Sequence, residues 1–149
     1  ERDVLLGAPR QYGISQTHKH LPEMTVVTGI KKKPIFSPIV ADFYSGMEVT
    51  VPIFKSQLEN NYTLEDIKAV YKEKYNTDIV FYKDEADEGG FLSANAMSLK
   101  DSMEISAYGN DDRIILVARY DNLGKGASGA ALECMNISMG EKPSLMLDI

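Results

Sequence analysis

The sequence predicts an α+β fold, with a mixed, largely antiparallel sheet and two or three helices. Runs typical of strands occur in clusters and do not alternate regularly with helices, which favours α+β over a doubly wound fold. Residues 63–75 have the apolar spacing of an amphipathic helix. Residues 103–109 and 113–121 are strand-like and separated only by Asn-Asp-Asp, which predicts an antiparallel hairpin.

The first predicted elements lie in residues 20–54. A short helix is expected over residues 20–30, because Pro22 suits the first turn and Gly29 lies near the end. Residues 34–40 and 46–54 read as strands.

The second of these strands shows the clearest alternation in the chain. Because every other residue is apolar, we expect one face of this strand to be buried. Pro52 has no N–H for a ladder, which favours an edge position or a strand end. The apolar positions are Met47, Val49, Val51 and Ile53.

The helix at residues 63–75 has Thr63 as a suitable N-cap and acidic residues in its first turn. Its expected apolar stripe consists of Leu64, Ile67, Val70 and Tyr71. A short strand is predicted at residues 78–83. The second hairpin strand is apolar on both faces, as a central strand should be.

Few charges interrupt the last predicted helix, residues 127–139, so we expect most of its surface to be buried.

Composition excludes several classes of protein. The chain has 149 residues, enough for one domain with a real core, and a net charge of −6. This charge argues against binding to nucleic acid or to anionic membranes, and no apolar run approaches the ~20 residues that span a bilayer. The single cysteine, Cys134, rules out an internal disulfide and suits a reducing cytoplasm. The start "ERDVLLGAPR", without Met, reads as the interior of a longer protein.

Gly124, Gly126 and Gly129 form a G-x-G-x-x-G motif after a strand-like run. Such a motif can cradle a dinucleotide, but it then needs a second parallel strand and an acidic residue about 20 positions on. The sequence after Gly129 offers no such strand. The alternatives are a flexible turn that allows close packing of a helix, and a helix N-terminus that attracts an anion.

Both histidines of the chain, His18 and His20, lie in "YGISQTHKHLPEM" together with Glu23. They could be surface neighbours without a shared role. They could also bind one zinc ion with Glu23 if they lay on a strand, where alternate residues share a face. The third interpretation is acid–base chemistry, with the carboxylate of Glu23 orienting an imidazole.

Three stretches together resemble the N-acetyl-gamma-glutamyl-phosphate reductase family. "YGISQTHKHLPEM" resembles its segment Y…H-R-H-x-P-E-I, and "KGASGAALECMN" is similar to its late segment K-G-A-[AS]-G-x-A-x-x-x-M-N. "FSPIVADFYSGMEVTV" more loosely resembles F-T-P-H-L-x-P-x-x-R-G-x-x-x-T-V. The order and the approximate spacing of these stretches also agree.

The resemblance implies an enzyme that reduces an acyl phosphate to an aldehyde with NADPH, on the route to arginine. Such enzymes have an N-terminal Rossmann domain for NADP and a substrate and dimerisation domain, like that of glyceraldehyde-3-phosphate dehydrogenases. A cysteine between the two attacks the acyl phosphate to give a thioester. Residues 1–149 would then be the substrate-binding and dimerisation domain, a homo-oligomer whose NADP is bound mainly by the missing domain.

The family's motif residues carry over by position. His20 is our first choice for the histidine that partners the cysteine, with His18 beside it and either able to be the acid–base group. Glu23 would orient the imidazole, and Tyr12 matches the family Tyr, which would bind substrate. The positions that match the late, cofactor-facing segment are Gly126, Ala127, Ser128, Gly129 and Asn136. No metal is implied.

The departures from the family are also informative. Cys134 is not the nucleophile, because the family cysteine precedes the histidines. The family His and Arg of the third stretch fall on Ile39 and Ser45, which leaves substrate anion binding open. The isolated chain should be inactive, because the hydride-donor site and the nucleophilic cysteine are both missing from it. The alternatives are an aminoadipyl-phosphate or other semialdehyde-forming reductase, and a non-catalytic dimerisation module.

Overall fold

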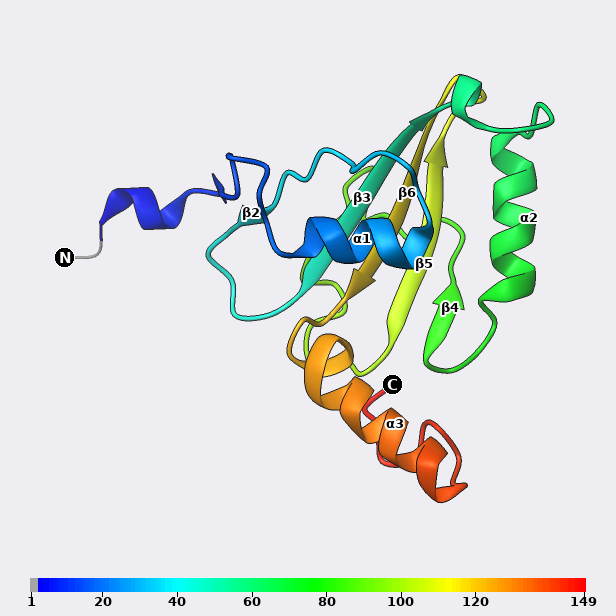
Figure 1. Cartoon of the computed structure of the whole chain (residues 1–149). Coiled ribbons are helices and arrows are strands. Elements are labelled where there is room, and N and C mark those ends of the chain that lie inside the picture. The colour runs from blue at the N-terminus through cyan, green and yellow to red at the C-terminus, as the bar shows by residue number, and fades with distance from the viewer. Residues whose placement is uncertain (1–2) are drawn as a thin grey trace. The chain divides into compact units, whose positions relative to one another are not determined.

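The computed structural model describes residues 3–149, which form two compact units, residues 3–44 and residues 45–149 (Figure 1). Each unit is described by itself. Within the described residues, no helix is long and apolar enough to cross a membrane.

The first unit carries short elements joined by long loops. A two-residue strand, β1, pairs antiparallel with β2 in the register Arg10↔Val40 and Gln11↔Ile39. The hydrogen bond from the Tyr12 N–H to the Pro38 carbonyl extends this ribbon by one step. The elements are the 3-10 turn Val4–Gly7, β1 (Arg10–Gln11), α1 (His20–Thr28) and β2 (Ile39–Val40).

Helix α1 confirms the predicted helix, whereas the strand predicted at residues 34–40 is wrong except for β2. Gly29 ends α1 in the left-handed conformation, with φ of 71°, and its N–H bonds the Thr25 carbonyl. Residues 34–38 form no ladder because Pro34 and Pro38 lack an N–H and Phe36 is bonded to a side chain instead.

The second unit is built on a four-stranded sheet of order β3-β6-β5-β4. Strand β6 lies antiparallel between β3 and β5, and β4 runs parallel to β5 at the other edge. This arrangement confirms the predicted α+β fold, the hairpin and the edge position of Pro52. The elements are β3 (Met47–Phe54), the 3-10 turn Lys55–Gln57, α2 (Leu64–Lys74), β4 (Val80–Tyr82), β5 (Met103–Gly109), β6 (Arg113–Tyr120), the π-helix Gly124–Ser128 and α3 (Gly129–Met139).

Helix α2 packs on one face of the sheet, which we call the α2 face. Thr63 and Asp66 form a capping box, in which each side chain accepts a hydrogen bond from the other residue's N–H. The apolar stripe that follows contacts the strands, with Leu64, Ala107 and Ile114 buried at its centre. Val70, predicted to belong to the stripe, is instead 56% exposed.

The face of β3 that we expected to be buried is largely exposed. Ile53 packs against the core beneath α2, but Met47, Val49 and Val51 are 38%, 41% and 47% exposed. Alternation shows which side chains share a face, but not whether anything covers that face. Helix α2 covers only one end of it.

The opposite face, which we call the loop face, is covered by the long segment between β4 and β5. Arg119 of β6 is 1% exposed and donates to the Glu104 carboxylate at 2.7 Å. The same guanidinium reaches the segment through the Ala86 carbonyl and the Glu88 carboxylate. Its hydrogen bond lowers the pKa of Glu88.

Helix α3 is mostly exposed, contrary to the prediction that most of its surface is buried. Gly129 and Asn136 are its buried residues. They face residue 101 and the C-terminal tail, which returns along the helix in Figure 1. Met135, Ile137 and Met139 are each at least half exposed.

Candidate functional site: a histidine cluster and a glycine-rich π-turn

The first unit gathers aromatic rings around the two histidines. The ring centroids of His18 and His20 are 4.7 Å apart, and Tyr12 lies 5.9 Å from His18 in an edge-on arrangement. Phe36 lies 4.9 Å from His18 and 6.2 Å from His20. His18 is half-buried in this cluster, while Tyr12 and His20 are exposed. The predicted histidine pair and the predicted Tyr are thus brought together.

The backbone at the start of α1 sets different conditions for the two imidazoles. The His20 N–H donates to His18 Nδ1 at 3.3 Å, and the Leu21 N–H donates to the His18 carbonyl at 3.1 Å. His18 therefore caps the helix N-terminus, where free N–H groups need acceptors. A neutral His18 that accepts at Nδ1 carries its proton on Nε2. His20 begins the helix, and its imidazole is exposed.

Glu23 does not make the expected contact. It lies in the first turn of α1, is exposed, and has no hydrogen bond or ion pair with either imidazole among the residues that the structure describes. The strand geometry needed for the zinc alternative is also absent, because His20 opens a helix. Within residues 3–149, no group of three His, Cys, Asp or Glu side chains could hold a metal ion.

Sequence reasoning missed the residues that build the wall of this cluster. The Gln16 carboxamide donates to the Phe36 carbonyl at 2.7 Å and accepts from the Phe36 N–H at 3.0 Å. Phe36 in turn contacts both histidine rings. The sequence gives little indication of this pair, because Gln16 and Phe36 are twenty positions apart and Phe36 lies in a segment wrongly predicted to be a strand.

The glycine-rich motif forms a π-helix that leads directly into α3. Adding a Cβ at Gly124 would overlap the Lys100 carbonyl oxygen, and at Gly129 it would overlap the Asp101 side chain. These two glycines allow close packing within this unit, as the alternative of a turn that packs a helix closely predicts. Gly126, Ala127 and Ser128 stay exposed. π-Helical turns occur frequently at functional sites.

Asp121, which the sequence did not single out, organises this turn. It is 1% exposed, and its carboxylate accepts from the N–H groups of Leu123 at 2.6 Å and Gly124 at 3.0 Å. It also accepts from the Ser45 hydroxyl at 2.7 Å and the Leu99 N–H at 2.5 Å. Burial alone would raise the pKa of Asp121, but these hydrogen bonds lower it to about 2.

Other predicted or noted positions have roles within the fold. The Asn136 amide donates to the carbonyls of Pro143 and Leu145, which fixes the C-terminal tail. Ser45, one of the departures from the family motif, is buried and bonded to Asp121, while Ile39 is exposed in β2. Cys134 is exposed on α3.

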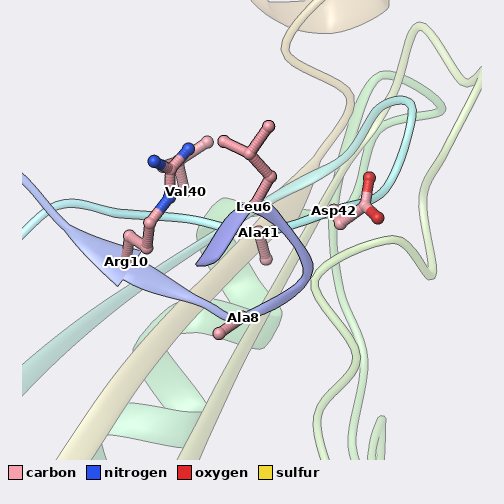
Figure 2. A pocket seen from close by; sticks show the side chains of 6 residues that line it. All are labelled: Leu6, Ala8, Arg10, Val40, Ala41 and Asp42. Atoms are coloured by element: carbon pink, nitrogen blue, oxygen red, sulfur yellow. The ribbon is translucent and has the colours of Figure 1, made fainter. Parts of the chain in front are cut away.

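A separate depression of about 190 Å³ lies beside the β1–β2 ribbon in the first unit (Figure 2). Arg10 and Asp42 supply its charged side chains and lie on either side of Leu6 in this view. None of the predicted catalytic residues lines it.

Comparison with known proteins covers most of the chain. The family described as semialdehyde dehydrogenase, dimerisation domain, matches residues 4–122. Proteins named N-acetyl-gamma-glutamyl-phosphate reductase from Brucella ovis, Brucella canis and Brucella melitensis are each 41% identical over 135 residues. The alignment covers 87% of this chain and 44% of each relative, so the chain spans less than half the length of these reductases.

The family match includes Tyr12, both histidines and the sheet, and it ends at Asn122, just before the π-helix. It covers well over half of the sequence. The chain therefore belongs to the semialdehyde dehydrogenase dimerisation-domain family.

Proposed function

We propose that residues 1–149 are the substrate-binding and dimerisation domain of an NADPH-dependent reductase that converts N-acetyl-glutamyl phosphate to its semialdehyde. The single observation that carries this proposal is the cluster of Tyr12, His18 and His20 at the start of α1, in a chain 41% identical to proteins named as that reductase. The rest of such an enzyme would supply the Rossmann domain and the nucleophilic cysteine.

The chemistry divides between the two parts. In the reaction, NADPH and a proton convert the acyl phosphate to the aldehyde, NADP⁺ and phosphate. NADPH supplies the hydride when bound, and the upstream cysteine supplies the thiolate that displaces phosphate. His20 is our choice for the group that draws the proton from that thiol and later gives it to the oxygen that becomes negative when hydride adds to the thioester. The same proton leaves this oxygen when the thiohemiacetal collapses to the aldehyde and the free thiol. The His20 imidazole is exposed, whereas Nδ1 of His18 already accepts a hydrogen bond.

The remaining predicted residues take supporting roles in this proposal. Tyr12 stands at the edge of the histidine cluster, where its hydroxyl could bind the substrate. Glu23 would approach an imidazole only after a side-chain rotation, because it makes no such contact here. The exposed backbone of Gly126, Ala127 and Ser128 fits close approach by NADP, since no Cβ at Gly126 hinders it. Gly129 and Asn136 would act indirectly, by fixing α3 and the tail.

We also propose that a second copy of the chain covers the exposed part of the α2 face. Met47, Val49 and Val51 form an apolar row on edge strand β3 that α2 leaves open. Exposed apolar rows of this kind mark protein interfaces. The family to which the chain belongs is described as a dimerisation domain, which supports a copy of the chain as the occupant.

The histidine assignment can be tested in a complete reductase that carries this domain. Replacing the acid–base group should lower kcat about 100-fold or more, because positioned proton transfer typically contributes 10²–10⁴-fold. We expect this for His20→Asn and a smaller loss for His18→Asn, measured as acyl-phosphate-dependent NADPH oxidation. Val27→Ala, an exposed change on α1, is the matched control. Wild-type turnover by His20→Asn would contradict the assignment.

The same assay distinguishes the related enzymatic alternative. Ile39 and Ser45 replace the family's His and Arg, and in this structure Ser45 is buried against Asp121, so it cannot reach a substrate anion. An aminoadipyl-phosphate reductase is therefore the second candidate. A higher kcat/KM with the aminoadipyl than with the glutamyl substrate would favour it.

A further inference from the structure

We propose that Gln16 is a positioning residue of the histidine site, which it shapes by holding Phe36 against both imidazoles. The effect of Gln16 on catalysis rests on the proposed function, but its effect on the position of Phe36 can be tested separately. Gln16 touches no reacting group. It acts through Phe36, whose ring lies 4.9 Å from that of His18.

The hydrogen bonds of Gln16 replace a missing strand pairing. Its carboxamide supplies one donor and one acceptor to the backbone of Phe36, at 2.7 Å and 3.0 Å. In an antiparallel ladder, every second residue exchanges such a pair of hydrogen bonds with the residue opposite it on the neighbouring strand. Pro34 and Pro38 flank Phe36 and donate no N–H, so the side chain takes over the role of a partner strand.

Gln16 has a backbone conformation that is energetically unfavourable for a glutamine. Gln16 has φ of 57°, in the left-handed region that side chains other than Asn, Asp and Gly seldom adopt. Its N–H closes a turn to the Gly13 carbonyl at 3.0 Å. Residues in such conformations persist only where the surroundings fix them. The hydrogen bonds to Phe36 hold Gln16 in this conformation.

Phe36 connects this clamp to the histidines. Its ring is tilted by 52° to His18 and lies nearly edge-on to His20, at 67°. An aromatic neighbour restricts the rotation of each imidazole, and His18 is also half-buried. Without the clamp, the segment between the prolines loses its hydrogen bonds to Gln16, and we expect the Phe36 ring to leave the cluster.

NMR of the 149-residue chain tests the positioning directly, because its two histidines give only two sets of imidazole signals. In the wild type we expect nuclear Overhauser contacts from the Phe36 ring to both imidazoles, and ring-current shifts of the imidazole protons. Gln16→Ala should lose both, while the contacts within α1 remain. Gln11→Ala, an exposed glutamine on β1, should keep them. Unchanged contacts from Phe36 in Gln16→Ala would overturn the proposal.

A second variant distinguishes the loss of the Gln16–Phe36 hydrogen bonds from unfolding of the first unit. In Gln16→Glu, the carboxylate still accepts from the Phe36 N–H but cannot donate to its carbonyl. Protonation restores the donor, so the Phe36 signals should move towards their wild-type positions as pH falls through the titration of the new carboxyl group. Signals of Phe36 that do not respond to this titration would also overturn the proposal.

The effect of Gln16 on catalysis is measured in the complete reductase. Gln16→Ala should lower kcat about tenfold with KM little changed, because substrate contacts stay in place while the imidazoles lose their orientation. If His20→Asn is active, the proposed function fails whatever Gln16 does. If His20→Asn is inactive and Gln16→Ala has wild-type kcat, the positioning role fails and the proposed function stands.

Discussion

Asp121 holds a negative charge in the interior of the second unit, where hydrogen-bond donors from three separate stretches of chain converge on it. These donors belong to Ser45, Leu99 and the pair Leu123 and Gly124. The carboxylate thus joins the start of β3, the segment before β5 and the first turn of the π-helix. At the scale of single residues, this group determines where the glycine-rich turn begins.

The lowered pKa of Asp121 predicts acid sensitivity. A folded-state pKa of about 2, below the ordinary 3.8, means that the charged form stabilises the fold. This contribution, about 2 kcal/mol from the size of the shift, is complete above pH 4 and is lost as pH falls from about 4 to 2. Denaturant unfolding at several pH values should show this loss in the wild type.

Asp121→Asn provides the comparison. An amide cannot accept from all of these donors, so we expect a loss of about 2–4 kcal/mol in unfolding free energy at pH 7. The difference between wild type and variant should shrink below pH 4. Asp112→Asn, at the exposed tip of the hairpin, is the control. A difference that is constant from pH 7 to pH 2 would contradict the assignment.

Single residues also show what the sequence could not predict. Ser45 and Asp121 are 76 positions apart, and Arg119 and Glu88 are 31 apart, so no local pattern relates them. The histidine pair could be found because its residues are adjacent and resemble a family motif. Gln16 could not, because its partner Phe36 lies in a segment that reads as a strand and is not one.

At the scale of elements, the glycine-rich turn is defined by the close approach of its backbone to residues 100 and 101. Gly124→Ala should lower the unfolding free energy by about 2 kcal/mol, because the new Cβ would overlap the Lys100 carbonyl, which is backbone and cannot rotate away. Thermal or denaturant unfolding measures this change.

Gly126→Ala is the matched control within the same turn. Its Cβ would lie 3.2 Å from the Asp121 carbonyl oxygen, a tight contact that a small shift relieves, and alanine favours helix. We expect its cost to be at least 1 kcal/mol smaller. Equal losses for the two variants would show that close packing does not explain why Gly124 is a glycine.

Elements with local signals were predicted well. The cap at Thr63, the acidic first turn and the apolar stripe specify α2 within its own residues, and the two strands around Asn-Asp-Asp specify the hairpin. The wrong predictions concern which side chains of β3 and α3 are buried. The alternation of β3 showed which side chains share a face, but α2 packs mainly over β5 and β4 and leaves most of that face of β3 open. Helix α3 contacts only a narrow strip of chain.

At the scale of the whole molecule, the open apolar row on β3 predicts association of two chains. Val49→Lys should shift the 149-residue chain from dimer to monomer, because it places a charge in the proposed interface without touching the core. Thr50→Lys, the next residue on the opposite face of the same strand, should leave the dimer intact. Sedimentation velocity distinguishes these outcomes, and a wild-type chain that is monomeric at tens of micromolar would contradict the proposal.

In the proposed enzyme, two parts of one protein supply different catalytic groups. We propose that the chain contributes the histidines and the dimer surface, and that the remainder of the reductase contributes the hydride site and the cysteine. The most direct measurement is NADPH oxidation with N-acetyl-glutamyl phosphate by the 149-residue chain alone, beside the complete reductase as positive control. The proposed division between the two parts predicts turnover by the complete enzyme and none above background by the chain alone. Turnover by the chain alone would contradict it.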